Sequence, residues 1–143
     1  MPDPAPSTGR VLGLDLGQAR IGVAISDPDR RLAVPLGTIH TGAPSDVQAI
    51  AALVRDQGVT AIVVGHPVSL SGAPREAADH AERFADALGG FLRLPVELQD
   101  ERLTTVEAER GLAAAGIRGR RRREVVDQQA AVIILQAWLD RHR

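Results

Sequence analysis

The feature that most constrains the fold is a carboxylate set inside an apolar, glycine-flanked run near the amino terminus. Asp15 has leucine on both sides and glycine two residues away in each direction, at Gly13 and Gly17. Beyond Gly17 the chain returns as a second apolar run, residues 21–26, which predicts two antiparallel strands joined by a tight turn. Burying an unpaired carboxylate is costly, so Asp15 requires an arginine, backbone N–H groups or a metal ion as its partner. The alternative is a hairpin with a solvated aspartate at its mouth.

The remaining hydrophobic pattern predicts three further strands and four helices. The predicted strands are residues 11–15, 21–26, 31–39, 60–65 and 94–99. The predicted helices are residues 45–57, 74–88, 104–116 and 124–141, with an arginine-rich loop before the last one. Three antiparallel strands followed by helix–strand–helix–strand–helix–helix indicate an α/β fold, with a mixed five-stranded sheet flanked by helices. We expect residues 1–9 to be a disordered leader and residues 10–143 to form a single domain.

Further acidic residues lie where they could join Asp15. Asp100 and Glu101 directly follow the fifth predicted strand, and Asp127 lies near the start of the last predicted helix. Asp127 heads an apolar stripe that continues at Ala131, Ile134 and Trp138. Taken singly, these acids fit a solvated turn or a favourable interaction with a helix dipole. Because strand one, strand five and the last helix can meet at one edge of the sheet, together they indicate a site.

Charge and composition limit the classes of partner. The net charge is −1 and every basic residue is arginine, yet five arginines occupy six positions from Arg118 to Arg123. Such a cluster can contact phosphates whatever the total charge, and the alternative is a solvated loop. Aromatic residues make up only 2% of the chain, which argues against a base-stacking platform. The absence of cysteine excludes disulfides and fits a cytoplasmic protein, and no apolar run approaches the roughly 18 residues of a membrane span.

Four motifs together carry a family resemblance. They are Asp15-Leu16-Gly17 with Arg20-Ile21-Gly22-Val23-Ala24, Gly65-His66-Pro67-Val68 with Gly72, Asp100-Glu101-Arg102-Leu103-Thr104-Thr105, and Val126-Asp127 with Ala130-Ala131. From about Arg10 to the carboxyl terminus the chain resembles the YqgF (RuvX-type) family. His66 departs from the pattern, because the family often has an apolar residue there. The resemblance implies an RNase H-like fold similar to that of the resolvase RuvC. It also implies a nuclease that resolves Holliday junctions or matures the 5′ end of the 16S ribosomal RNA precursor.

The resemblance also assigns roles to individual residues. It implies that Asp15, Glu101 and Asp127 are catalytic and bind the metal, with Asp100 as a weaker candidate ligand. RNase H-like nucleases use two divalent ions roughly 3.5–4 Å apart, bridged by an aspartate, which would be Asp15. A carboxylate set without a histidine or cysteine cluster suits Mg²⁺ or Mn²⁺. The nucleic-acid-binding residues would be Arg20, Arg102, Arg120, Arg121, Arg122 and Arg123.

Two other functions and one assembly question remain open. The Asp-x-Gly element is shared with actin-like nucleotide-binding proteins, but that fold needs a second related domain, for which 143 residues leave no room. The other alternative is a non-catalytic nucleic-acid-binding or ribosome-assembly factor. Junction resolution requires two opposed cuts and hence a two-fold dimer, whereas one cut in a precursor RNA needs only a monomer. A small-residue helix at residues 112–115 could form part of an interface, and the alternative is ordinary packing of that helix on the sheet. We expect a weak homodimer.

Overall fold

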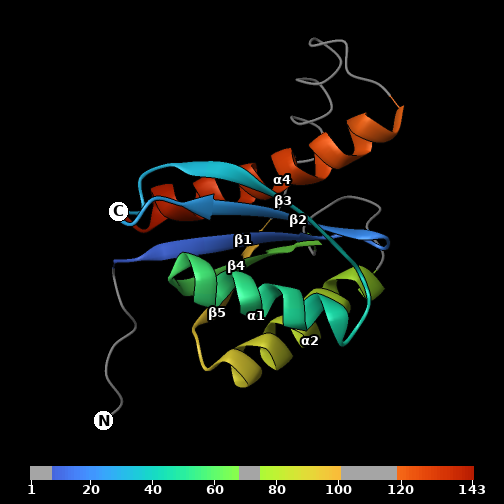
Figure 1. Ribbon diagram of the computed structural model, residues 1–143, viewed down its shortest axis with the longest axis horizontal. Coiled ribbons are helices and arrows are strands. Elements are labelled where there is room, and N and C mark those ends of the chain that lie inside the picture. The colour runs from blue at the N-terminus through green and yellow to red at the C-terminus, as the bar shows by residue number, and fades with distance from the viewer. Residues whose placement is uncertain (1–7, 68–74, 101–118) are drawn as a thin grey trace.

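A mixed five-stranded sheet with helices on both faces forms the core of the computed structural model, which describes residues 8–67, 75–100 and 119–143 (Figure 1). The strands are β1 (Arg10–Leu16), β2 (Arg20–Ser26), β3 (Ala33–His40), β4 (Val59–His66) and β5 (Val96–Asp100). The helices are α1 (Ser45–Gln57), α2 (Arg75–Leu92) and α4 (Gly119–Arg141). The strand order is β3-β2-β1-β4-β5, antiparallel among β1 to β3 and parallel between β1, β4 and β5. The predicted architecture is therefore confirmed.

Two hydrophobic cores lie on the two faces of the sheet. Strand β1 serves both, because successive side chains of a strand point to opposite faces. Leu12 and Leu14 pack with α1 and α2, whereas Val11 packs with α4. Figure 1 shows α4 covering one face of the sheet and the pair α1 and α2 covering the other. The face of β1 that carries Val11, Gly13 and Asp15 is consequently the α4 face.

Glycines allow α4 to lie directly on the sheet. A Cβ atom on Gly13 would be 2.7 Å from Cβ of Leu135, closer than real Cβ atoms approach. A Cβ atom on Gly22 would collide with the backbone carbonyl of Asp127. Any larger residue at these two strand positions would push α4 away from the sheet.

Helix α4 begins earlier than the sequence pattern predicts. The arginine-rich run was expected to be a loop ending before Glu124, but α4 starts at Gly119, so residues 119–123 are helical. Arginine is a good helix former, and helix propensity outweighs the turn signal of the neighbouring glycines. Asp127 therefore lies in the third turn of α4 rather than the first. Its interpretation as a first-turn acid that favours the helix dipole is wrong.

Other element boundaries also differ from the predicted ranges. Strand β3 starts at Ala33 instead of residue 31, because the Asp27 carboxylate accepts the backbone N–H groups of Arg31 and Leu32, both at 2.8 Å, and holds them in the turn. Helix α2 continues past Leu88 to Leu92. Asp100 is the last residue of β5 rather than the residue that follows it. The predicted helix at 104–116 and the small-residue segment at 112–115 lie outside the described residues.

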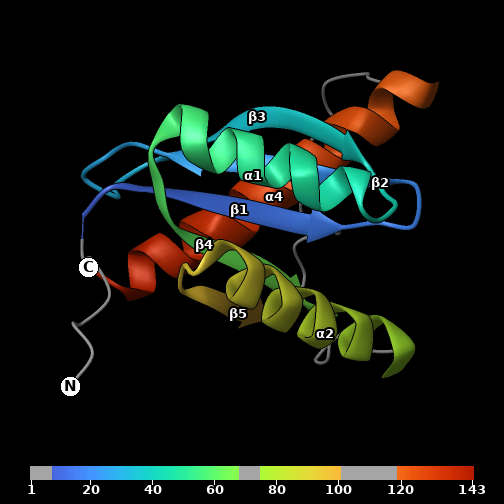
Figure 2. The same ribbon diagram turned by 60° about the horizontal axis from the view of Figure 1, so that its bottom comes forward.

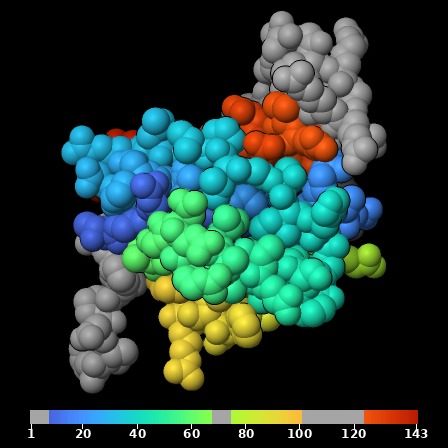
Figure 3. Space-filling model, in the orientation of Figure 1, coloured from blue at the N-terminus to red at the C-terminus, as the bar shows by residue number. Residues whose placement is uncertain are grey.

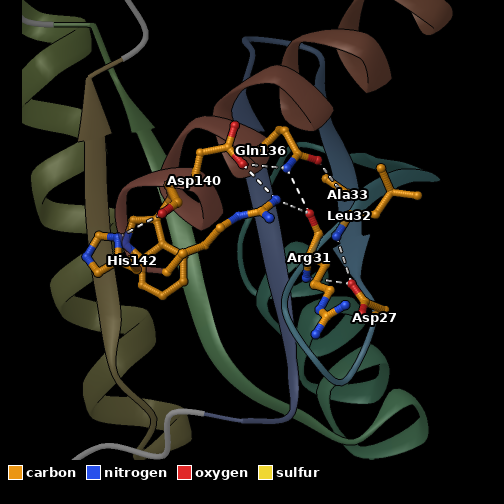
Figure 4. Close-up of polar contacts among 9 residues, drawn as sticks. Asp27, Arg31, Leu32, Ala33, Gln136, Asp140 and His142 are labelled. Atoms are coloured by element: carbon orange, nitrogen blue, oxygen red, sulfur yellow. Dashed lines mark hydrogen bonds and ion pairs between the residues drawn. The ribbon is translucent and has the colours of Figure 1, made fainter.

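Polar contacts join the carboxyl-terminal end of α4 to the turn between β2 and β3 (Figure 4). The Gln136 side-chain carbonyl accepts the Ala33 N–H at 2.9 Å, and its amide donates to the Arg31 carbonyl at 3.0 Å. The same amide donates to Asp140 at 3.0 Å. This end of α4 is therefore fixed to the sheet at the end opposite Asp15. In the described ranges no helix is long and apolar enough to cross a bilayer.

The turn at Asp27 predicts a pH-dependent stability. The hydrogen bond from the Leu32 N–H, together with that from Arg31, lowers the pKa of the Asp27 carboxyl. A lowered pKa in the folded state stabilises the protein above the unfolded value of about 3.9, and this contribution is lost as the pH falls through the folded pKa. We expect the wild type to melt at a higher temperature than Asp27→Asn at pH 5. This difference in melting temperature should shrink as the pH is lowered through the folded pKa of Asp27. A calorimetric pH series checks this, and a constant difference between the two proteins would contradict it.

Candidate metal and nucleic-acid site

The site is built on the hairpin that joins β1 and β2. The Gly17 N–H donates to the Arg20 carbonyl at 2.9 Å, which closes a tight turn, and a Cβ atom on Gly17 would be 2.5 Å from that oxygen. Thr41 holds the turn from outside: its hydroxyl donates to the Gly17 carbonyl at 2.9 Å and its N–H donates to the Ala19 carbonyl at 3.0 Å. The backbone at Arg20 is thereby fixed relative to the end of β1.

Asp15 and Asp127 both lie at this end of the sheet. Asp15 is the last but one residue of β1, and its register partner on β2 is Gly22. The backbone of Asp127 lies directly over Gly22. Figure 2 shows that β1 ends and α4 begins at the same end of the molecule, and in Figure 3 the first part of α4 (orange) lies against the hairpin (blue). The sequence expectation that Asp15 and Asp127 lie at one edge of the sheet agrees with this placement.

Arg20 pairs with Asp127. Its Nε donates to Oδ2 of Asp127 at 2.9 Å, and the two side chains are 22% and 23% exposed. Burial raises the pKa of the Asp127 carboxyl. The hydrogen bond and charge of Arg20 act in the opposite direction, and the negative charge of Glu124 adds to the rise. The local environment therefore disfavours a lone negative charge at Asp127 and favours a cation beside it.

Asp100 is directed to the other face of the sheet. It pairs in register with His66 of β4, and Val64, two residues before His66, belongs to the core beneath α1 and α2. Strand alternation therefore gives Asp100 the face opposite to that of Asp15. This register separates Asp100 from the pair formed by Asp15 and Asp127. Glu101 and Arg102 lie outside the described residues, as do the side chains of Arg120, Arg121, Arg122 and Arg123.

The described donors suit a hard divalent ion. Within residues 8–67, 75–100 and 124–143, no three acidic, histidine or cysteine side chains gather closely enough to hold a metal. Two carboxylates, Asp15 and Asp127, share the edge, and a third from Glu101 would complete the predicted set. Oxygen donors of this kind prefer Mg²⁺ or Mn²⁺, and a cation would offset the cost of burying Asp127.

The sequence pattern missed two features of this region. One is the close approach of α4 at Gly22, which an isolated glycine inside an apolar strand could have signalled. The other is a contact of 3.2 Å between His66 Nε2 and a carboxylate oxygen of Glu82 on α2, which no spacing rule connects. Near it, on the α2 face, is a cavity of about 350 Å³ whose lining includes Leu16, Gln18, Glu76 and His80. The contact of His66 with Glu82 and the cavity lie on the opposite side of the sheet from Asp127.

Comparison with known proteins identifies the family. The RuvX family, described as Holliday junction resolvase, matches residues 9–141. A Mycolicibacterium paratuberculosis protein named "Putative pre-16S rRNA nuclease" is 47% identical over 144 residues, covering 99% of this chain and 86% of its own. A Pelotomaculum thermopropionicum protein of the same name is 49% identical over 133 residues, covering 92% and 86%.

Among solved structures, the fold matches that of Thermus thermophilus RuvC in complex with a Holliday junction substrate. The TM-score is 0.53 at 17% sequence identity, and the match covers 92% of this chain and 94% of the RuvC chain. This likeness confirms the RNase H-like fold that the sequence motifs imply. Together with the match over residues 9–141, it shows that the chain belongs to the RuvX (YqgF) family, a family of nucleases.

Proposed function

We propose that this chain cuts the precursor of 16S ribosomal RNA by divalent-metal-dependent hydrolysis of a phosphodiester bond. The observation that carries the proposal is the placement of Asp127 over Gly22, the register partner of Asp15. Two carboxylates from opposite ends of the chain share one edge of the sheet, and the family to which the chain belongs is one of nucleases. The relatives in Mycolicibacterium and Pelotomaculum carry the name of a nuclease for this RNA.

The residues divide the work of such a reaction. Asp15 and Asp127, with Glu101, would hold Mg²⁺ or Mn²⁺. When bound, the metal would stabilise charge on the phosphate and lower the pKa of a coordinated water molecule. Asp15 is fixed by the paired strands and Asp127 by the close packing of α4, so neither carboxylate must be reordered when the substrate arrives. Arg102 and the arginines at 120–123 would neutralise the substrate backbone.

Junction resolution is the second candidate, favoured by the family description and by the RuvC fold. It differs in stoichiometry, because two symmetric incisions require two copies of the single acidic site. The decisive experiment offers the protein a 5′-labelled 16S precursor fragment and a labelled four-way DNA junction in parallel, with Mg²⁺, with Mn²⁺ and with EDTA. We expect metal-dependent cutting of the RNA near the mature 5′ end and sedimentation as a monomer or a weak dimer.

Paired cuts in the junction, made by a stable two-to-one complex, would instead support the resolvase. Binding of either nucleic acid with no cleavage under any metal condition would contradict both candidates and favour a non-catalytic assembly factor. The Asp15→Asn variant is the control for contaminating nucleases, because it keeps the volume of the side chain and removes its charge.

The arginine run carries its own prediction. If Arg121, Arg122 and Arg123 contact phosphates, replacing all three by alanine should flatten the dependence of log K on log salt by up to about 3 on duplex nucleic acid, since each contact contributes about 0.9. The loss of affinity should be similar for all sequences, because phosphate contacts carry no sequence information. Fluorescence anisotropy over a salt series measures the slope. An unchanged slope would show that these arginines make no phosphate contacts.

A further inference from the structure

Arg20 contacts Asp127 and lies on the same face of the sheet as Asp15. It follows the β1–β2 turn on the same face of β2 as Gly22, and Gly22 is the register partner of Asp15. A residue two positions from a register partner is a diagonal neighbour, which a long side chain such as arginine can reach. Its guanidinium contacts Asp127 at 2.9 Å. The positive charge of Arg20 thus lies at the end of the sheet that carries both Asp15 and Asp127.

The charge of Arg20 stabilises the partly buried Asp127 carboxylate. Asp127 is 23% exposed, and a carboxylate in such a place is stabilised by a neighbouring cation. Arg20 supplies this cation in the metal-free protein. A divalent ion bound by Asp127 would supply a larger charge to the same oxygen atoms, and it would repel the guanidinium. The two cations therefore compete for one carboxylate.

We propose that Arg20 is a placeholder for the divalent ion: it neutralises Asp127 in the metal-free protein and is released to a substrate phosphate when the ion binds. The proposal rests on the metal-dependent function proposed above. The Arg20 side chain is 22% exposed, so it has access to solvent and to a phosphate brought to this end of the sheet. Guanidinium binds phosphate through paired N–H groups, which makes arginine suited to both partners. Metal binding and nucleic-acid binding would then reinforce each other through Arg20.

A fixed structural clamp is the competing interpretation, and it predicts the opposite sign. If Arg20 only holds Asp127 in place, its removal should loosen the carboxylate and weaken metal binding. If Arg20 is a placeholder, its removal should eliminate a competitor and strengthen metal binding by the free protein. The sign of the change in Mn²⁺ affinity therefore distinguishes the two roles.

The first experiment is calorimetric titration of Mn²⁺ into the full chain and its variants. We expect Arg20→Gln to lower the Mn²⁺ dissociation constant by about tenfold and Arg20→Lys, which keeps the charge, to stay near the wild type. Arg55→Gln is the matched control, because Arg55 lies on α1 with 75% of its side chain exposed and pairs with Asp56, outside the site. Melting temperatures report whether each variant is folded. An unchanged or weaker Mn²⁺ affinity in folded Arg20→Gln would overturn the proposal.

The second experiment observes the release directly. In the metal-free protein the Nε–H of Arg20 should give a shifted, slowly exchanging NMR signal, identified by its loss in Arg20→Lys. Saturating Mg²⁺ should move this signal to the position of a solvated guanidinium, and a signal that does not move would overturn the proposal. Neither experiment requires cleavage. A protein that binds Mn²⁺ and releases Arg20 but cuts no RNA would refute the proposed function and leave this inference standing.

The third experiment tests the coupling. Affinity for the precursor RNA is measured with Ca²⁺, as an ion expected to bind without turnover, and with EDTA. The wild type should gain more affinity from the ion than Arg20→Gln does, and the salt slope of the variant should fall by about 0.7 to 0.9 in the presence of the ion. Equal gains in the two proteins would contradict the transfer of Arg20 to phosphate.

Discussion

Asp15→Asn should reduce cleavage by more than about 100-fold, which is the upper range for losing a group that merely orients a metal ligand. The substitution keeps the volume and removes the charge that would recruit the ion, so the core beneath α4 should be unaffected. Without metal, the melting temperature should stay the same or rise, because the charge near Asp127 is removed. Single-turnover cleavage and thermal unfolding of the same preparation give both numbers.

The effect of Asp15→Asn on cleavage can be compared with the effects of replacing the other candidate acidic residues. Asp127→Asn and Glu101→Gln should behave like Asp15→Asn, whereas Asp100→Asn should matter less, since the register directs Asp100 to the opposite face. A folded Asp15→Asn protein with wild-type turnover would remove this residue from the site. Unfolding of the variant would show that Asp15 is needed for the fold itself.

Gly22→Ala should damage both stability and function. The added methyl group would collide with the Asp127 carbonyl, and a backbone atom cannot move aside as a flexible side chain can. Overpacking of this kind typically costs about 1–3 kcal/mol of unfolding free energy, and here it also displaces Asp127 from Asp15. We expect lower stability in urea, weaker Mn²⁺ binding and loss of cleavage, all from one methyl group.

Gly90→Ala is the matched control for that prediction. Gly90 lies in α2, and an added Cβ atom there would meet nothing within 4 Å. Alanine favours a helix over glycine by about 0.5–1 kcal/mol, so this variant should be more stable with unchanged cleavage. If Gly22→Ala were as stable and active as Gly90→Ala, the close packing of α4 on β2 would be contradicted.

The strands were predictable because their signals are local. An apolar run with a glycine turn at Gly17 defines the first hairpin, and the unbroken apolar segment of β4 defines a strand buried on both faces. The early start of α4 was not predictable from turn signals, because consecutive arginines are compatible with both a loop and a helix.

The site was predictable only in part, for a similar reason. Sequence motifs indicated Asp15 and Asp127, but the contact of Arg20 with Asp127 joins residues that are 107 positions apart. The separation of Asp100 from Asp15 depends on the register between β4 and β5, which cannot be predicted from composition or residue spacing. Glu101 stays a prediction, because it lies outside the described residues.

The contacts of Gln136 with the turn after β2 have a consequence for the far end of the same helix. Gln136 anchors α4 to Arg31 and Ala33, nine residues after Asp127 and about 13 Å away along the helix axis. A helix is stiff over such a length, and a slip of one residue would turn every side chain by about 100°. The contacts of Gln136 therefore fix the rotation of α4 about its own axis. Inserting a single alanine between Gln136 and Asp127 would turn Asp127 by about 100° relative to the anchor, and would also shift core residues such as Ala131 and Ile134 against the sheet.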